Sequence, residues 1–184
     1  MLSRKNMIEY LKLLGAELKR RDKEGEILLT GGAAMCLVHS AREMTKDIDA
    51  LYEPAEDINQ IAARIAEEYD LPADWLNDSV KGFVTAGAPT EEFMALDGLR
   101  VTAVTPEYLL AMKLMASRYG EKDSEDIIFL MKKLDIRAAD QAADIVIKFY
   151  PPNRIPPKTM YVIEECLAEA LAQKQSGGPT MKML

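Results

Sequence analysis

Hydrophobic residues follow two different spacings in the first half of the chain. Over about the first 20 residues they recur every three or four positions, which predicts an amphipathic helix. Residues 26–30 form a short apolar run, and residues 45–52 alternate between polar and apolar side chains, so both segments are predicted strands. The apolar stretch that follows the glycine pair at positions 31 and 32 predicts a helix between them. The local order is therefore strand, helix, strand.

Helices and strands continue to alternate up to residue 105. Isoleucines at helical spacing predict a helix over residues 54–69, and residues 72–82 are expected to form a short helix or an ordered loop capped by Asp74. Residues 83–87 are a predicted strand. Residues 91–105 predict a hairpin that turns at Asp97-Gly98, because an Asp-Gly pair favours the backbone of a two-residue turn.

The pattern after residue 105 is helical. Four segments have helical periodicity, at residues 106–119, 124–134, 137–149 and 158–175. We therefore expect an α+β fold, in which a small mixed sheet flanked by helices is followed by a C-terminal helical bundle. The expected parts are an α/β part at residues 1–105, a helical part at 106–175 and a disordered tail at 176–184.

Charge and composition exclude several classes of protein. The formal net charge of −7 disfavours a chain that coats DNA or RNA, because an acidic surface repels phosphate backbones. No uncharged apolar run reaches the roughly 20 residues that cross a bilayer, and the first helix lacks the features of an export signal, so we expect a cytoplasmic protein. Cys36 and Cys166 lack the neighbours typical of zinc or redox sites and are predicted core thiols.

Two aspartates one residue apart, Asp47 and Asp49, stand inside the second predicted strand. Residues two apart on a strand face the same side, about 6 to 7 Å apart, so both carboxylates should project together. A divalent cation would relieve their repulsion, and carboxylates with water and phosphate oxygens suit Mg²⁺ or Mn²⁺. The alternative is an exposed edge strand on which both acids are solvated, or neutralised by Lys46 or Arg42.

The glycine pair Gly31-Gly32 stands where the first predicted strand gives way to a helix. Without side chains, backbone amides at such a position allow a phosphate to approach closely, and the positive end of the helix favours an anion. A glycine pair alone is also typical of a tight turn. Followed by two aspartates on the next strand, it indicates a phosphate-binding loop beside a metal site, which together would bind a nucleoside triphosphate.

Residues 29–52, LTGGAAMCLVHSAREMTKDIDALY, resemble the signature of the polymerase-β-like nucleotidyltransferase superfamily. In that signature a glycine pair opens a helix and an Asp-x-Asp motif lies on the neighbouring strand. Residues 104–130 resemble a lysine- and aspartate-containing segment of AbiEii-type nucleotidyltransferase-like proteins. With the DWLND stretch at residues 74–78, the chain is similar to the family labelled DUF6036. The resemblance implies a nucleotidyltransferase-type sheet.

The resemblance also implies roles for residues of the α/β part. Gly31 and Gly32 would hold the triphosphate, and the two aspartates would bind the metal ions. Most active members of the superfamily carry a third carboxylate on an adjacent strand. The candidates for it in this chain are poor, because two begin a predicted strand and one belongs to the hairpin turn: Glu91, Glu92 and Asp97.

In the helical part, the resemblance implies that Lys113 and Asp126, or Asp123, belong to the site. A lysine ammonium could offset charge on the leaving pyrophosphate. The alternatives are that Lys113 extends to solvent and that the two acids only favour the start of a helix. Arg42 and Lys46 would border the phosphates, although a salt bridge to a neighbouring acid is the more frequent role for either.

These observations predict a Mg²⁺-dependent nucleotidyltransferase. It would move a nucleoside monophosphate from a nucleoside triphosphate to an RNA end, a protein or a small molecule, and the AbiEii resemblance suggests a toxin-antitoxin or defence setting. The alternative is a catalytically weak or inactive module of the same fold that binds a nucleotide, a partner protein or a second copy of itself. The sequence does not specify the nucleotide or the acceptor.

Overall fold

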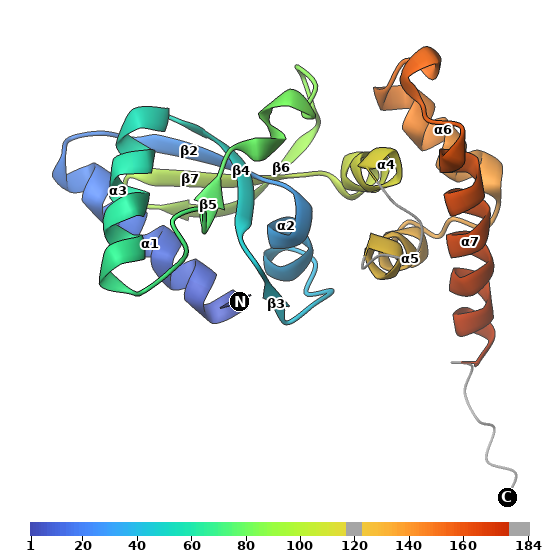
Figure 1. The fold of residues 1–184 in the computed structure, drawn as a ribbon, viewed down its shortest axis with the longest axis horizontal. Coiled ribbons are helices and arrows are strands. Elements are labelled where there is room, and N and C mark those ends of the chain that lie inside the picture. The colour runs from blue at the N-terminus through green and yellow to red at the C-terminus, as the bar shows by residue number, and fades with distance from the viewer. Residues whose placement is uncertain (117–122, 177–184) are drawn as a thin grey trace, which may run out of the picture. The chain divides into compact units, whose positions relative to one another are not determined.

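The computed structural model describes residues 1–116 and 123–176. The chain divides into two compact units, Met1–Thr105 and a second unit that begins at Pro106. The fold is mixed α and β, as predicted, with the strands in the first unit and a helical second unit (Figure 1). Residues 117–119 of a predicted helix and residues 177–184 of the predicted tail lie outside the described residues.

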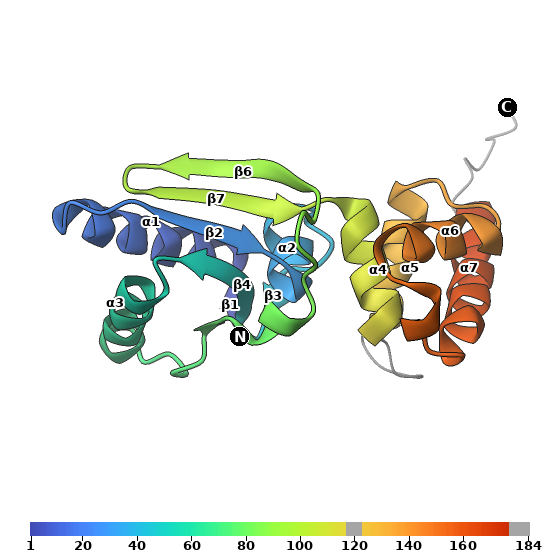
Figure 2. The same ribbon diagram turned by 90° about the horizontal axis from the view of Figure 1, so that it is seen from above.

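The first unit is built on a sheet of five strands: β2 (Gly25–Leu29), β4 (Ile48–Glu53), β5 (Leu76–Asn77), β6 (Thr90–Leu96) and β7 (Leu99–Val104). They stand in the order β5-β4-β2-β7-β6. The central strand β2 pairs antiparallel with β4 and parallel with β7. β5 joins β4 in parallel, and β6 joins β7 as the predicted hairpin (Figure 2). The sheet is therefore mixed, as predicted.

Helices α1 (Arg4–Arg20) and α3 (Ala55–Glu68) pack on one face of this sheet. α1 contacts β7, α3 contacts β4, and the two helices contact each other. Side chains alternate along the strands, so every second one points toward these helices. The core between sheet and helices includes the fully buried side chains of Leu11, Leu14, Leu29, Ala50 and Val101.

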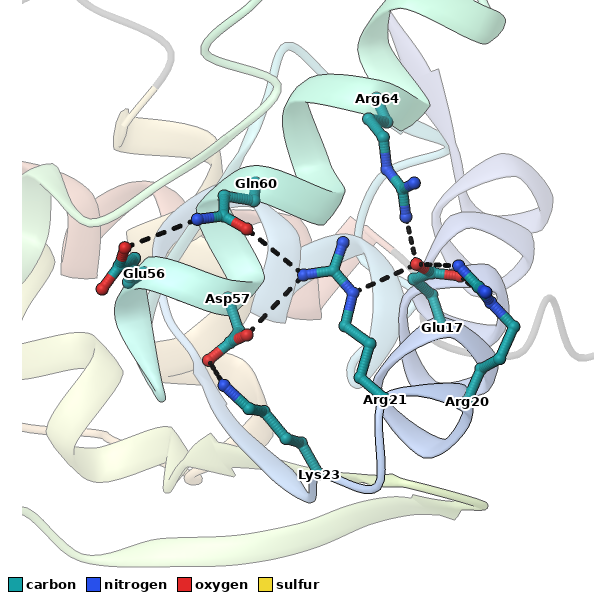
Figure 3. A network of polar contacts seen from close by, with 8 residues as sticks. All are labelled: Glu17, Arg20, Arg21, Lys23, Glu56, Asp57, Gln60 and Arg64. Atoms are coloured by element: carbon teal, nitrogen blue, oxygen red, sulfur yellow. Dashed lines mark hydrogen bonds and ion pairs between the residues drawn. The ribbon is translucent and has the colours of Figure 1, made fainter.

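A network of charged side chains joins α1 to α3 beside this core (Figure 3). Glu17 accepts hydrogen bonds from Arg20 at 2.7 and 2.8 Å, from Arg21 at 3.1 Å and from Arg64 of α3. Arg21 also reaches Asp57 of α3 at 3.6 Å. The hydrogen bond from Arg20, with those from Arg21 and Arg64, lowers the pKa of the Glu17 carboxyl to about 2, although partial burial opposes the shift. The network therefore favours ionised Glu17.

Three short elements surround the start of β4. Helix α2 (Gly31–Leu37) follows β2, as predicted. Strands β1 (Leu2–Ser3) and β3 (Met44–Thr45) form an antiparallel pair of their own. The hydrophobic pattern does not predict this pair, because two residues are too few to show a period.

The segment between α3 and β6 differs from the prediction. Residues 83–87, a predicted strand, form turns instead. Gly82 precedes this run and Gly87 ends it, and both glycines favour turns. Residues 72–82, expected to form a short helix or an ordered loop capped by Asp74, contain β5 and a 3₁₀ helix, η1 (Ser79–Gly82), whose N-cap position is Asp78. Trp75 is fully buried, and its indole N–H donates to the carbonyl oxygen of Ala62 at 3.0 Å, which anchors the segment to α3.

The second unit consists of helices α4 (Pro106–Ala116), α5 (Asp123–Lys133), α6 (Ala139–Phe149) and α7 (Lys158–Ser176), with a 3₁₀ helix, η2 (Pro152–Arg154), in the connector. α4 packs against the other three helices. Its buried Tyr108 meets the ring of Phe149 edge-on, with the ring centroids 4.9 Å apart. Cys36 of the first unit and Cys166 of the second are both buried, as predicted, and burial raises the pKa of the Cys166 thiol to about 11.

In the described parts of the chain, no helix is both long enough and apolar enough to cross a bilayer.

Candidate functional site

Thr30, the last residue before the glycine pair, ties the loop to the strand that carries the aspartates. It is fully buried, and its amide and its hydroxyl both donate to the carbonyl oxygen of Asp49, at 3.0 and 3.1 Å. Thr30 occupies the N-cap position of α2, but its side chain makes no capping hydrogen bond there. The amide of Ala34 donates to the Thr30 carbonyl at 3.0 Å, which is the first hydrogen bond of the helix. The amides of the glycine pair come before this bond, in the first turn, where amides have no partner within the helix.

Gly31 lies directly against the Asp49 carboxylate. Its φ is +51°, a left-handed conformation that residues with side chains rarely adopt. A Cβ at this position would stand 3.0 Å from Oδ2 of Asp49. The backbone conformation therefore favours glycine, and a side chain here would press on the carboxylate. The structure places the predicted phosphate loop in contact with a predicted metal ligand.

Gly32 is enclosed by residues that precede the aspartates. A Cβ here would stand 2.5 Å from the hydroxyl oxygen of the buried Thr45 and 3.5 Å from Nη1 of Arg42. The missing side chain lets Thr45 and Arg42 approach the loop. The Arg42 guanidinium is thus a cation beside the glycine amides, where an anion would be attracted.

Asp47 and Asp49 are both half-buried, on either side of the fully buried Ile48. Burial raises the pKa of the Asp47 carboxyl, and the negative charges of Asp49 and Asp74 raise it further, while Lys46 acts in the opposite direction. The two predicted metal ligands therefore lie close enough to repel each other. Lys46 is exposed and compensates only part of this repulsion.

Residues after β5 complete the surroundings of Asp49. The hydroxyl of Ser79 donates to Oδ1 of Asp49 at 3.3 Å, and the Ser79 amide donates to Oδ1 of Asn77 at 3.1 Å. Asn77 stands opposite Asp49 in the parallel pairing of β4 with β5. Hydrophobic periodicity does not predict that Ser79 or Asn77 belongs to the site. The available signal is the DWLND stretch of the family resemblance, which ends immediately before Ser79.

The three acids considered as a third metal ligand are engaged elsewhere or distant. Glu91 and Glu92 belong to β6, and strands β7 and β2 separate β6 from β4. Glu92 forms an ion pair with an arginine of β7 at 3.5 Å, and Asp97 pairs with Lys19 at 3.4 Å. Across residues 1–116 and 123–176, no group of three His, Cys, Asp or Glu side chains is placed to hold a metal.

Lys113 and Asp126 meet inside the second unit. The Nζ of Lys113 is 2.7 Å from Oδ2 of Asp126 and 3.0 Å from Oδ1 of Asp123. Lys113 is 9% and Asp126 4% exposed, so this lysine does not extend to solvent. The ion pairs join α4 to α5, and a pair this buried depends on both partners. The pair belongs to the second unit, whereas the glycine pair and the two aspartates belong to the first.

The residues of the first unit fit a divalent cation that arrives with a phosphate. Mg²⁺ is usually held in proteins by one or two carboxylates together with water and substrate phosphates. Asp47 and Asp49 supply two carboxylates. Burial first, and the charge of Asp49 second, raise the pKa of Asp47, and a cation would favour its ionised form. The amides of the glycine pair supply hydrogen-bond donors for the phosphate oxygens. The arrangement is therefore suited to a metal-bound polyphosphate.

Comparison with known proteins gives a match to a family model. A family described as a nucleotidyltransferase of unknown function (DUF6036) matches residues 6–150. The matched range includes the glycine pair, the two aspartates, Lys113 and Asp126. No curated protein and no solved structure matches the chain.

Proposed function

Because the chain belongs to the DUF6036 family of nucleotidyltransferases, as its sequence predicted, we propose that it transfers a nucleoside monophosphate from a nucleoside triphosphate to an acceptor, with Mg²⁺ or Mn²⁺ as cofactor. The observation that carries the proposal is the contact between Gly31 and Asp49, which sets a phosphate-binding loop against a carboxylate. One ligand, a triphosphate with its divalent ion, would satisfy both the amides and the acids.

The proposed transfer exchanges one P–O bond for another. A hydroxyl oxygen of the acceptor forms a bond to the α-phosphorus, and the bond from this phosphorus to the oxygen that bridges to the β-phosphorus breaks. Pyrophosphate leaves with that oxygen and the bonding electron pair, and the acceptor proton passes to water. When bound, a divalent ion neutralises phosphate charge and aligns the reacting oxygens.

The residues of the chain contribute position and charge to this reaction. Asp47 and Asp49 would hold the ion, and the amides of Gly31 and Gly32 would donate to phosphate oxygens. Arg42, beside Gly32, would offset charge that develops on the pyrophosphate. Lys46 is exposed next to Asp47 and would border the phosphates.

We propose in addition that Lys113, positioned by Asp123 and Asp126, supplies a second positive charge to the leaving group. Its support is the family match, which extends over α4 and α5, and the burial of a lysine where an apolar side chain would pack without cost. A tie between two helices would account for the same contacts. Stability and transfer activity, measured on the same variants, distinguish the two roles.

The second candidate function is a module that binds a nucleotide or a partner and catalyses weakly or not at all. It is favoured by one observation, that the described residues offer two carboxylates at the site but no cluster of three metal-ligating side chains. A toxin-antitoxin or defence setting, a cytoplasmic location and an AbiEii-like activity stay predictions from the sequence.

The test of the proposed function is incubation of the protein with each labelled nucleoside triphosphate, Mg²⁺ and acceptor fractions of RNA, protein and small molecules. We expect label transfer by the wild type and none by Asp47→Ala/Asp49→Ala. Equal transfer by both proteins would exclude the assigned site. Calorimetry with ATP and GTP, with and without Mg²⁺, tests the second candidate, since nucleotide binding that needs no metal would favour the module.

A further inference from the structure

The second face of the five-stranded sheet presents side chains away from α1 and α3. Paired residues of neighbouring strands share a face, so Leu28, Leu51 and Thr102 project together on this side. All three are half-buried, whereas their neighbours Ile27 and Val101 on the helix-covered face are 1% and 0% exposed. The open face therefore has an apolar floor in its middle.

Two hollows that open to solvent are lined by residues of this face. One has a volume of about 340 Å³ and is lined by Leu28, Leu51, Glu53 and Thr102, among others. The other has a volume of about 430 Å³ and is lined by Glu24, Glu92 and Leu96, among others. Both include Glu26 and Arg100. Small ligands bind in clefts that enclose most of their surface, so a long, shallow surface suits an extended segment of a macromolecule.

This face leads directly to the candidate site. Asp49 and Leu51 are two residues apart on β4, so their side chains project on the same side, about 6 to 7 Å apart. The glycine pair follows the end of β2, whereas Leu28 and Leu51 lie within the sheet. In an in-line transfer the acceptor and the leaving pyrophosphate stand on opposite sides of the α-phosphorus. With pyrophosphate at the glycine amides, the acceptor would approach from the open face.

The charge of this face favours some classes of acceptor over others. The charged residues that line the two hollows are four glutamates and one arginine: Glu24, Glu26, Glu53, Glu92 and Arg100. Arg100 already lies 3.8 Å from Glu26 and 3.5 Å from Glu92 in ion pairs. The remaining negative charge attracts cations and repels the phosphate backbone of a nucleic acid.

We propose that the open face binds a basic segment of a protein acceptor and brings one of its hydroxyl side chains to the α-phosphate. The inference rests on the proposed function and names the class of its acceptor. Lysine and arginine heads of that segment pair with the glutamates, while their apolar stems lie over Leu28 and Leu51. The hydroxyl oxygen of its serine, threonine or tyrosine forms the bond to the α-phosphorus as pyrophosphate leaves, and its proton passes to water.

The experiment uses three fluorescent probes and the 184-residue chain. The probes are a short lysine- and arginine-rich peptide with a central tyrosine, the same peptide with glutamate at each basic position, and a polyuridine oligonucleotide. Fluorescence anisotropy should show binding of the basic peptide alone, weakening as salt is added. Glu26→Lys/Glu92→Lys should weaken that binding at least about tenfold, because both reversed charges lie in the proposed contact. Glu67→Lys/Glu68→Lys, the same charge change at exposed positions of α3, should leave it intact.

Binding of a nucleoside triphosphate by the wild type in the presence of Mn²⁺, measured in parallel, keeps this inference separate from the proposed function. Nucleotide binding together with peptide binding that only Glu26→Lys/Glu92→Lys weakens supports the inference. Nucleotide binding without peptide binding, equal peptide binding by both double variants, or preference for the oligonucleotide overturns it and leaves the proposed function intact. Absence of nucleotide binding contradicts the proposed function, and the inference falls with it.

Discussion

Thr30 donates two hydrogen bonds to a single oxygen, the carbonyl of Asp49, one from its amide and one from its hydroxyl. The carboxylate of the same aspartate lies against Gly31 and accepts a hydrogen bond from Ser79. The loop after β2 and the segment after β5 therefore converge on one residue of β4. Asp49 is the structural centre of the candidate site, and Asp47 is its half-buried neighbour.

The hydroxyl bond of Thr30 can be removed almost without a change of shape. We expect Thr30→Val to lower the free energy of unfolding by about 1 kcal/mol, because a buried hydrogen bond contributes about that much. Thr30→Ser keeps the hydroxyl but removes a buried methyl group, so it should lose a comparable amount through packing while retaining the bond. Denaturant unfolding of the three proteins measures the effect, and a valine variant as stable as the wild type would show that the hydroxyl bond does not hold the loop.

Gly31→Ala tests the contact between the loop and the Asp49 carboxylate. Gly87→Ala is the matched control, because Gly87 also has a positive φ, of +77°, but a Cβ there would meet nothing within 4 Å. Both variants should lose about 1 kcal/mol through backbone strain. Only Gly31→Ala should also displace the carboxylate and weaken metal-dependent nucleotide binding, which calorimetry measures. Equal nucleotide binding by both variants would contradict a role for this contact.

Asp47→Asn should stabilise the metal-free protein at neutral pH. Burial and the charge of Asp49 raise the pKa of Asp47 in the folded state, so ionised Asp47 favours the unfolded state, and its unfavourable effect develops as pH rises through that raised pKa. The variant should therefore melt at a higher temperature than the wild type near pH 7. Well below the ordinary pKa of an aspartate, where Asp47 is protonated in both states, the two proteins should melt together.

Addition of Mg²⁺ with a nucleoside triphosphate should reverse that order. A ligand that binds only the folded state raises the melting temperature, and the wild type alone has both carboxylates to hold the ion. If the ligand raises the melting temperature of the wild type no more than that of Asp47→Asn, this would argue against Asp47 as a metal ligand.

Glu17 should show the opposite dependence on pH. Its pKa is lowered to about 2, so its contribution to stability is present above the ordinary pKa of 4.5 and is lost as pH falls toward about 2. Glu17→Gln should therefore be less stable than the wild type at pH 7 and equal to it near pH 2. Glu67→Gln, at an exposed position of α3, should be as stable as the wild type at both pH values. A constant difference across this range would refute the ionic origin of the effect.

The role of Lys113 can be tested by replacing both Lys113 and its buried partner Asp126. Lys113→Met alone removes the ammonium that pairs with the buried Asp126 carboxylate and should cost about 3 kcal/mol of stability. Lys113→Met/Asp126→Asn should recover most of that loss. Label transfer, measured where both variants are folded, should stay impaired in the double variant if Lys113 acts on the pyrophosphate. Recovery of both stability and transfer would identify the pair as a tie between α4 and α5.

The sequence predicts the elements whose burial imposes a regular period. The helical spacing of α1 and the alternation around Ile48 follow directly from which side chains are buried. Hydrophobic period predicts neither the two-residue strand β5 nor the turns at residues 83–87. β5 forms only by pairing with β4. The site divides in the same way. The proximity of Gly31 to Asp49 follows from local chain order, whereas Ser79 reaches Asp49 through tertiary pairing of a segment 30 residues away.

The register of the central strand has a consequence for protein synthesis. β2 pairs with β7 so that Gly25 stands opposite Leu99, far later in the chain. A growing polypeptide therefore carries the glycine loop and both aspartates long before β2 gains its second neighbour. Pairings between distant segments form slowly, so we expect the nascent first unit to expose the unpaired edge of β2 until translation has passed the hairpin. Affinity for a nucleotide should arise only after that point, when the helices of the second unit are about to be made.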